Sequence, residues 1–99
     1  MSVQFDMHIE FDSFKSQRNF LQRGLSFDRV ADFDFESAKV WQDTRLPYSE
    51  VRYVALGYLT YRLHVLCFTP VLNGIRVISL RKANAREGAK HGFSLTHSE

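Results

Sequence analysis

Residues 74–87 read GIRVISLRKANARE, and this stretch predicts the last strand of a β-sheet followed by a short helix. Ile75 to Leu80 is mostly apolar and β-branched, as in a strand buried on both faces. Asn84 and Glu87 have the spacing of a capping box, which begins a helix. Four cations against one acid predict that an anion binds where the strand ends. The cations are Arg76, Arg81, Lys82 and Arg86, and the acid is Glu87.

The segments just before this stretch alternate in polarity like antiparallel strands. Asn73-Gly74 is a strong hairpin signal and joins the last strand to residues 61–69. Pro70 is expected to end that strand, because proline cannot donate to the ladder. Residues 50–56 form another strand, with a turn at residues 57–60. Residues 38–42 are a weaker strand, and residues 43–49 are a loop.

The first part of the chain predicts one strand and two helices. Residues 7–11 alternate as a strand, and Asp12 is placed to cap a helix from Ser13 to about Gln22. This helix carries an apolar stripe, and Gly24 occupies the usual left-handed position after it. Ser26 is expected to cap a second helix over about residues 27–35. The stripe of the first helix comprises Phe14, Arg18 and Leu21, with Phe20 beside them.

This order of elements predicts an α+β fold. It is an antiparallel sheet of four to five strands, with two N-terminal helices packed on it and a short C-terminal helix. The 99 residues make a single domain, with a flexible tail over about residues 91–99. A signal segment and an apolar run long enough to span a membrane are both absent, so a cytoplasmic protein is expected.

Charge is divided unevenly along the chain. Residues 1–50 carry nine acids and six Lys and Arg, whereas residues 51–99 carry seven Lys and Arg and two acids. A local net charge of +5 in the second half suggests a face for nucleic acid or another polyanion. An ordinary solvated charged surface is the alternative.

The candidate chemistry uses cations and histidine. The four histidines and Cys67 lack the spacing of a metal site, so neither a metal nor a cofactor is expected. Arginines on one sheet face would bind phosphate, and His64 would transfer protons near neutral pH. The predicted catalytic residues are His64, Arg76, Arg81 and Glu87. The predicted RNA- or phosphate-binding residues are Arg52, Arg62, Lys82 and Lys15.

Such a set fits metal-free RNA cleavage, which needs a proton acceptor, a proton donor and cations for the charge at phosphorus. A structural alternative stands beside each assignment. His64 would be a hydrogen-bonded core histidine, Arg76 a partner of Glu50 or Asp43, and Glu87 a helix cap.

Several motifs in this order resemble the BrnT family of bacterial type II toxins. Its opening is similar to Phe11-Asp12-x-x-Lys15-x-x-x-Asn19, and its next motif to Gly24-Leu25-Ser26-Phe27. Glu50-x-Arg52 and Gly57 match its middle. Its most specific signature resembles Arg76-Val77-Ile78-Ser79-Leu80-Arg81-Lys82-Ala83 with Glu87. The resemblance covers about residues 8–90.

The resemblance implies a RelE-like fold and a ribonuclease that inhibits translation. It also implies a BrnA-type antitoxin partner, a ribbon-helix-helix protein through which the complex would bind promoter DNA. Gln22-Arg23 stand where the family usually has Lys-His, and Leu80 replaces the usual Ala. If that histidine serves catalysis, His64 must replace it here. The alternative function is a catalytically silent basic module that docks an acidic partner or nucleic acid.

Overall fold

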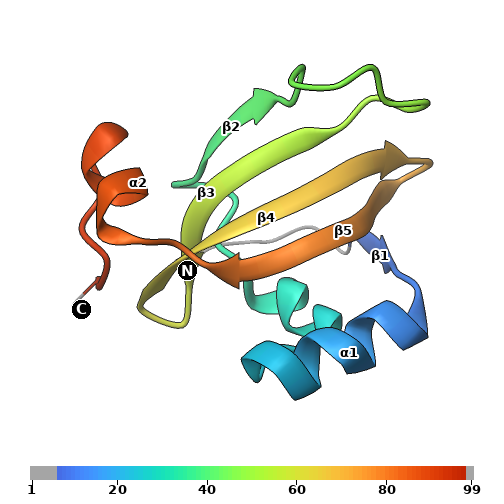
Figure 1. The fold of residues 1–99 in the computed structure, drawn as a ribbon, viewed down its shortest axis with the longest axis horizontal. Coiled ribbons are helices and arrows are strands. Elements are labelled where there is room, and N and C mark those ends of the chain that lie inside the picture. The colour runs from blue at the N-terminus through green and yellow to red at the C-terminus, as the bar shows by residue number, and fades with distance from the viewer. Residues whose placement is uncertain (1–6, 98–99) are drawn as a thin grey trace.

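The computed structural model describes residues 7–97, which form a five-stranded sheet with helices at its two sides (Figure 1). The helical elements are α1 (Ser13–Arg23), the 3₁₀ helix η1 (Phe27–Asp32) and α2 (Ala85–Lys90). The strands are β1 (His8–Glu10), β2 (Lys39–Gln42), β3 (Tyr53–Leu59), β4 (Arg62–Val71) and β5 (Gly74–Lys82), arranged in the order β1-β5-β4-β3-β2. The predicted α+β class is confirmed.

The sheet is mixed, whereas an antiparallel sheet was predicted. β2, β3, β4 and β5 pair antiparallel in turn, but β1 lies parallel to β5. Gly74 permits this close pairing, because a Cβ added there would lie 1.8 Å from the carbonyl oxygen of His8. The hairpin at Asn73-Gly74 forms as predicted, with Asn73 in a left-handed conformation at φ 60°.

Two predicted strand ends are wrong. The turn predicted at residues 57–60 lies later, at Thr60 and Tyr61. Gly57 is inside β3, where a Cβ would lie 2.8 Å from the Cβ of Ala38. β4 continues through Pro70 to Val71. β3 begins opposite Phe68, so β4 is paired on one side only at Pro70, and a proline is tolerated on such an edge.

The N-terminal helices differ in how they meet the sheet. Asp12 caps α1 by accepting from the backbone N–H groups of Phe14 and Lys15, as predicted. Ser26 makes no side-chain cap bond, and the second helix is a 3₁₀ helix that ends at Asp32. Its Phe27 and Val30 enter the larger apolar core, which lies between η1 and the sheet. Among the described residues, neither core includes an apolar side chain of α1.

The opposite face of the sheet carries a smaller core, which holds α2 and the chain after it. Phe93 and Leu95 pack against Leu63 and its neighbours, and the N–H of Leu63 donates to the carbonyl of Leu95 at 2.8 Å. Residues 91–97 therefore return along the sheet, although a flexible tail was predicted. Residues 98–99 lie outside the described residues.

Candidate functional site

A groove of about 440 Å³ lies on the α2 face of the sheet. Its floor is formed by inward side chains of β3, β4 and β5, among them Cys67 and Ser79. One wall is Trp41 with the loop that follows β2, and the other comes from α2 and His91. Its polar lining includes Gln42, Asp43, Thr44, Arg45, Ser79, Arg81, Glu87 and His91.

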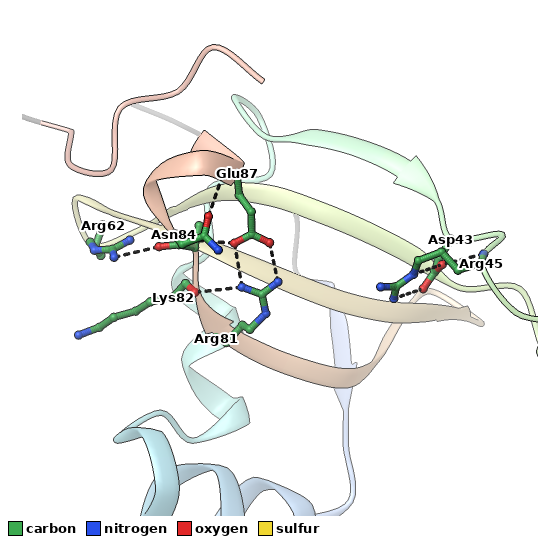
Figure 2. Close-up of polar contacts among 8 residues, drawn as sticks. Asp43, Arg45, Arg62, Arg81, Lys82, Asn84 and Glu87 are labelled. Carbon is green, nitrogen blue, oxygen red and sulfur yellow. Dashed lines mark hydrogen bonds and ion pairs between the residues drawn. The ribbon is translucent and has the colours of Figure 1, made fainter. Parts of the chain in front are cut away.

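Arg81 and Glu87 form the best-defined contact in the groove (Figure 2). The Nη1 and Nη2 atoms of Arg81 donate to the two carboxylate oxygens of Glu87 at 2.9 and 2.6 Å. Hydrogen bonding from Arg81 lowers the pKa of Glu87 to about 2, and the same bond raises the pKa of Arg81. At neutral pH the groove therefore holds a charged guanidinium against a charged carboxylate.

Glu87 is also the capping residue that the sequence predicts. The Asn84 side chain accepts from the backbone N–H of Glu87 at 2.8 Å, and the Glu87 side chain accepts from the backbone N–H of Asn84 at 2.9 Å. Since Glu87 Oε1 also accepts from Arg81, the start of α2 is tied directly to the end of β5. The capping box thus fixes Glu87, and Glu87 in turn holds the guanidinium of Arg81.

A second arginine–carboxylate pair lies on the same face of the sheet, at the other side of the groove (Figure 2). Arg45 donates to both carboxylate oxygens of Asp43, at 2.9 and 2.8 Å, and Tyr48 donates to the same carboxylate at 3.1 Å. Hydrogen bonding by Arg45 holds the pKa of Asp43 well below its usual range. The field of Arg45 opposes the rise in the pKa of Arg81, in keeping with its position on the same groove.

Trp41 of one wall and His91 of the other stack on each other, so the two walls of the groove meet there. Their ring centroids are 4.7 Å apart, with an interplanar angle of 19°. His91 follows α2 directly, and its charge contributes to the lowered pKa of Glu87, after the larger effect of the Arg81 hydrogen bond. The stack places an imidazole and a flat aromatic surface beside the Arg81–Glu87 pair.

The predicted convergence of arginines with His64 is wrong. In the β4–β5 register, Val65 lies opposite Arg81 and His64 opposite Lys82. Residues directly opposite each other share a face of the sheet, so His64 points away from the groove. Its side chain is 2 % exposed, its Nδ1 contacts the carbonyl of Arg62 at 2.7 Å, and burial lowers its pKa. This is the structural alternative, a hydrogen-bonded core histidine.

The other predicted cations are also distributed away from Arg81. Arg62 donates to the carbonyls of Leu63 and Ala83 at 2.6 and 3.0 Å, and so joins β4 to the end of β5. Arg76 donates to Glu10 of β1 at 2.8 Å, instead of pairing with Glu50 or Asp43. Lys82 and Lys15 are exposed and do not line the groove.

Arg52 lies beside the groove in a second hollow of about 300 Å³. Its guanidinium covers the Tyr48 ring at 4.2 Å and lies 3.6 Å from the carboxylate of Glu50. Residues 42–44 line both hollows, so Arg52 flanks the groove on the Arg45 side.

Several residues of the groove were not predicted as site residues from the sequence. Trp41 and His91 are fifty residues apart, and only the sheet register and the fold of residues 85–91 bring them together. Arg45 lies in a loop without a recognisable motif. The two departures from the family pattern lie outside the groove. Gln22 and Arg23 are exposed on α1, and Leu80 is buried in the larger core.

Among residues 7–97, no three side chains of His, Cys, Asp or Glu are placed to hold a metal ion together. Within the same residues, no helix has the length and apolar character needed to cross a membrane. A family model described as the ribonuclease toxin BrnT of type II toxin-antitoxin systems matches residues 11–87. This range includes both arginine–carboxylate pairs and stops before His91. No curated protein matches the chain.

Proposed function

The chain belongs to the BrnT family of ribonuclease toxins of type II toxin-antitoxin systems, and from this premise we propose that it cleaves RNA in the groove without a metal ion and so stops translation. The observation that carries the proposal is the Arg81–Glu87 pair, which lies in the groove that Arg45 and His91 also line. These side chains include the cations and proton-transfer groups that metal-free phosphodiester cleavage requires.

The proposed reaction transfers one proton at each end of the scissile bond. Glu87 accepts the proton of the 2′-hydroxyl, whose oxygen then forms a bond to phosphorus. The bond from phosphorus to the 5′ oxygen breaks, and His91 donates a proton to that oxygen. The products are a 2′,3′-cyclic phosphate and a 5′-hydroxyl. Arg81 and Arg45 neutralise the extra negative charge at phosphorus in the transition state.

The pKa of Glu87 links this chemistry to substrate binding. With a pKa of about 2, the carboxylate bonded to Arg81 is a weak base. When a phosphate accepts the hydrogen bonds of Arg81, the carboxylate loses its main stabilising partner, and its pKa rises toward the ordinary value of 4.5. Glu87 therefore becomes a better proton acceptor only while RNA is bound.

The walls of the groove would hold the RNA on either side of the cut. Trp41 offers a partly exposed ring, on which a base can stack. Arg52 flanks the groove and would contact the next phosphate along the strand. His64, Arg62 and Arg76 have no part in this scheme, because each is engaged outside the groove.

The remaining partners follow from the family. The antitoxin would be a BrnA-type ribbon-helix-helix protein that forms a hetero-oligomer with this chain. Promoter DNA would be bound through that antitoxin, and both proteins would act in the cytoplasm. The family model supports an antitoxin and an RNA substrate, and these finer assignments are part of the proposal.

Expression of the chain alone in a bacterial host tests the proposal. Induction is expected to arrest growth and degrade cellular RNA, while Arg81→Ala, produced at equal level, does neither. Arg86→Ala is the matched control, because Arg86 is an exposed cation of α2 that does not line the groove. Equal arrest by wild type and Arg81→Ala would remove Arg81 from the site. Folded wild-type protein that binds RNA without arrest or cleavage would indicate the silent binding module instead.

A further inference from the structure

The first helix is attached to the rest of the protein by its polar side. The hydroxyl of Ser16 accepts from the backbone N–H of Phe27 at 2.8 Å. The amide of Asn19 donates to the carbonyls of Leu25 and Leu80 at 2.8 and 2.9 Å. Ser16 is the one buried residue of α1. These bonds decide which side of the helix faces inward.

The apolar stripe of α1 consequently faces solvent, although a stripe of this kind usually packs on the core. Phe14 is 80 % exposed and Leu21 is 75 % exposed. They are seven residues apart, so they share one face, and Arg18 lies between them at helical spacing. We call Phe14, Arg18 and Leu21 the α1 surface. Phe20, at its border, is also more than half exposed.

The charged side chains of α1 are all positive. Arg18 lies within the α1 surface and Lys15 beside it. Arg23 is seven residues from Ser16 and therefore shares the other side of the helix, and the helix carries no acidic residue. Asp12, at its N-terminus, uses its carboxylate to cap the helix. Large apolar side chains flanked by two cations form a surface complementary to apolar side chains flanked by carboxylates.

We propose that the α1 surface is the docking site for an acidic, amphipathic segment of the partner antitoxin. The identification of the partner rests on the proposed function. A second copy of the chain is a poorer occupant, because pairing two α1 surfaces would bring Arg18 and the neighbouring Lys15 of both copies together. An antitoxin segment with apolar residues at helical spacing and flanking Asp or Glu matches both the apolar stripe and the charge.

The α1 surface lies away from the groove. α1 is on the η1 side of the sheet, whereas the groove lies on the face that carries α2 (Figure 1). Substitutions in the α1 surface should therefore weaken antitoxin binding and leave RNA cleavage intact. The two properties can be measured separately on the same variants.

The test measures the affinity of the purified full chain for the purified antitoxin encoded beside it. The variant is Phe14→Asp with Leu21→Asp, and the matched control is Leu72→Asp. Leu72 is 87 % exposed at the β4–β5 hairpin, so this control also places an acid on an exposed leucine. The double variant is expected to bind the antitoxin about 100-fold more weakly, with unchanged melting and RNA cleavage, and the control to bind like wild type.

Three results would overturn the inference. The double variant could bind the antitoxin as tightly as the control does. The affinity could fail to fall in Arg18→Glu or at high salt, which would exclude acidic complementarity. The free wild-type chain could be a dimer and the double variant a monomer, which would make the α1 surface a self-association interface. If the wild-type chain had no ribonuclease activity but the double variant still lost antitoxin binding, the proposed function would be refuted and the docking site would stand.

Discussion

Glu87 is the residue on which both structure and proposed chemistry depend. It accepts from the guanidinium of Arg81 and from the backbone of Asn84, and its pKa is about 2 in the folded chain. The same carboxylate thus joins α2 to β5 and would serve as proton acceptor. A substitution there should change stability and cleavage together.

Glu87→Gln is expected to reduce RNA cleavage at least about 100-fold, because the amide cannot accept the 2′-hydroxyl proton. It should also lower the free energy of unfolding by about 1 to 2 kcal/mol at pH 7. The folded pKa is lowered from 4.5, so this stability difference is complete above pH 4.5 and disappears as the pH falls toward 2. Urea titrations of both proteins at pH 7 and pH 3 measure it. An equal difference at both pH values would contradict the ionic contribution of Glu87.

His64 is expected to matter for acid stability and not for cleavage. Burial lowers its pKa below 6.5, and its Nε2 atom is buried without a hydrogen-bond partner. As the pH falls through 6.5, the unfolded chain gains a proton on His64 before the folded chain does, so the fold loses stability. His64→Leu should cleave RNA at the wild-type rate, within about twofold, and lose less stability between pH 7 and pH 5. A large loss of cleavage in a folded variant would return His64 to the site.

At the scale of elements, the short helix α2 carries much of the site. It has only six residues, so its position depends on the capping box at Asn84 and on contacts of the chain that follows it. Gly88 is bonded both to Asn84 and to the chain after α2. Its N–H donates to the carbonyl of Asn84, and its carbonyl accepts from the N–H of Phe93 at 2.8 Å. Together these bonds place Glu87 and His91 at the groove.

Asn84→Ala should therefore destabilise the protein by about 1 kcal/mol and reduce cleavage about tenfold, since it loosens the start of α2. Asn84→Ser is the control, because serine caps helices nearly as well as asparagine and should keep most of the activity. Thermal melting and initial rates of RNA cleavage measure the two effects. Wild-type activity in a destabilised Asn84→Ala protein would show that the cap does not position the site.

At the same scale, the sequence predicts most elements because local signals agree. The caps at Asp12 and Asn84, the left-handed Gly24 and the Asn73-Gly74 hairpin depend on neighbouring residues only. The parallel pairing of β1 with β5 could not be predicted in this way, because it joins residues more than sixty positions apart. The buried side of α1 was also missed, since polar bonds from Ser16 and Asn19 outweigh its apolar stripe.

At the scale of the whole molecule, the two faces of the sheet carry different features. The alternation of β4 correctly places Arg62 and His64 on one face, but its register with β5 puts Arg81 on the other. A bulge at Cys67 and Phe68 changes the alternation along β5, which sequence alone does not reveal. One side therefore holds the groove with Arg45, Arg81, Glu87 and His91, and the other presents α1.

In the proposed scheme, RNA is cleaved on one side of the sheet and the antitoxin docks on the other. Cleavage in the groove is proposed to depend on Arg81 and to need no metal ion. The purified chain, incubated with RNA in excess EDTA, should give fragments with a 2′,3′-cyclic phosphate and a 5′-hydroxyl. Arg81→Ala should lose at least about 100-fold in rate, while Arg86→Ala cleaves like wild type. Cleavage that requires an added metal ion, or that persists in Arg81→Ala, would contradict this mechanism.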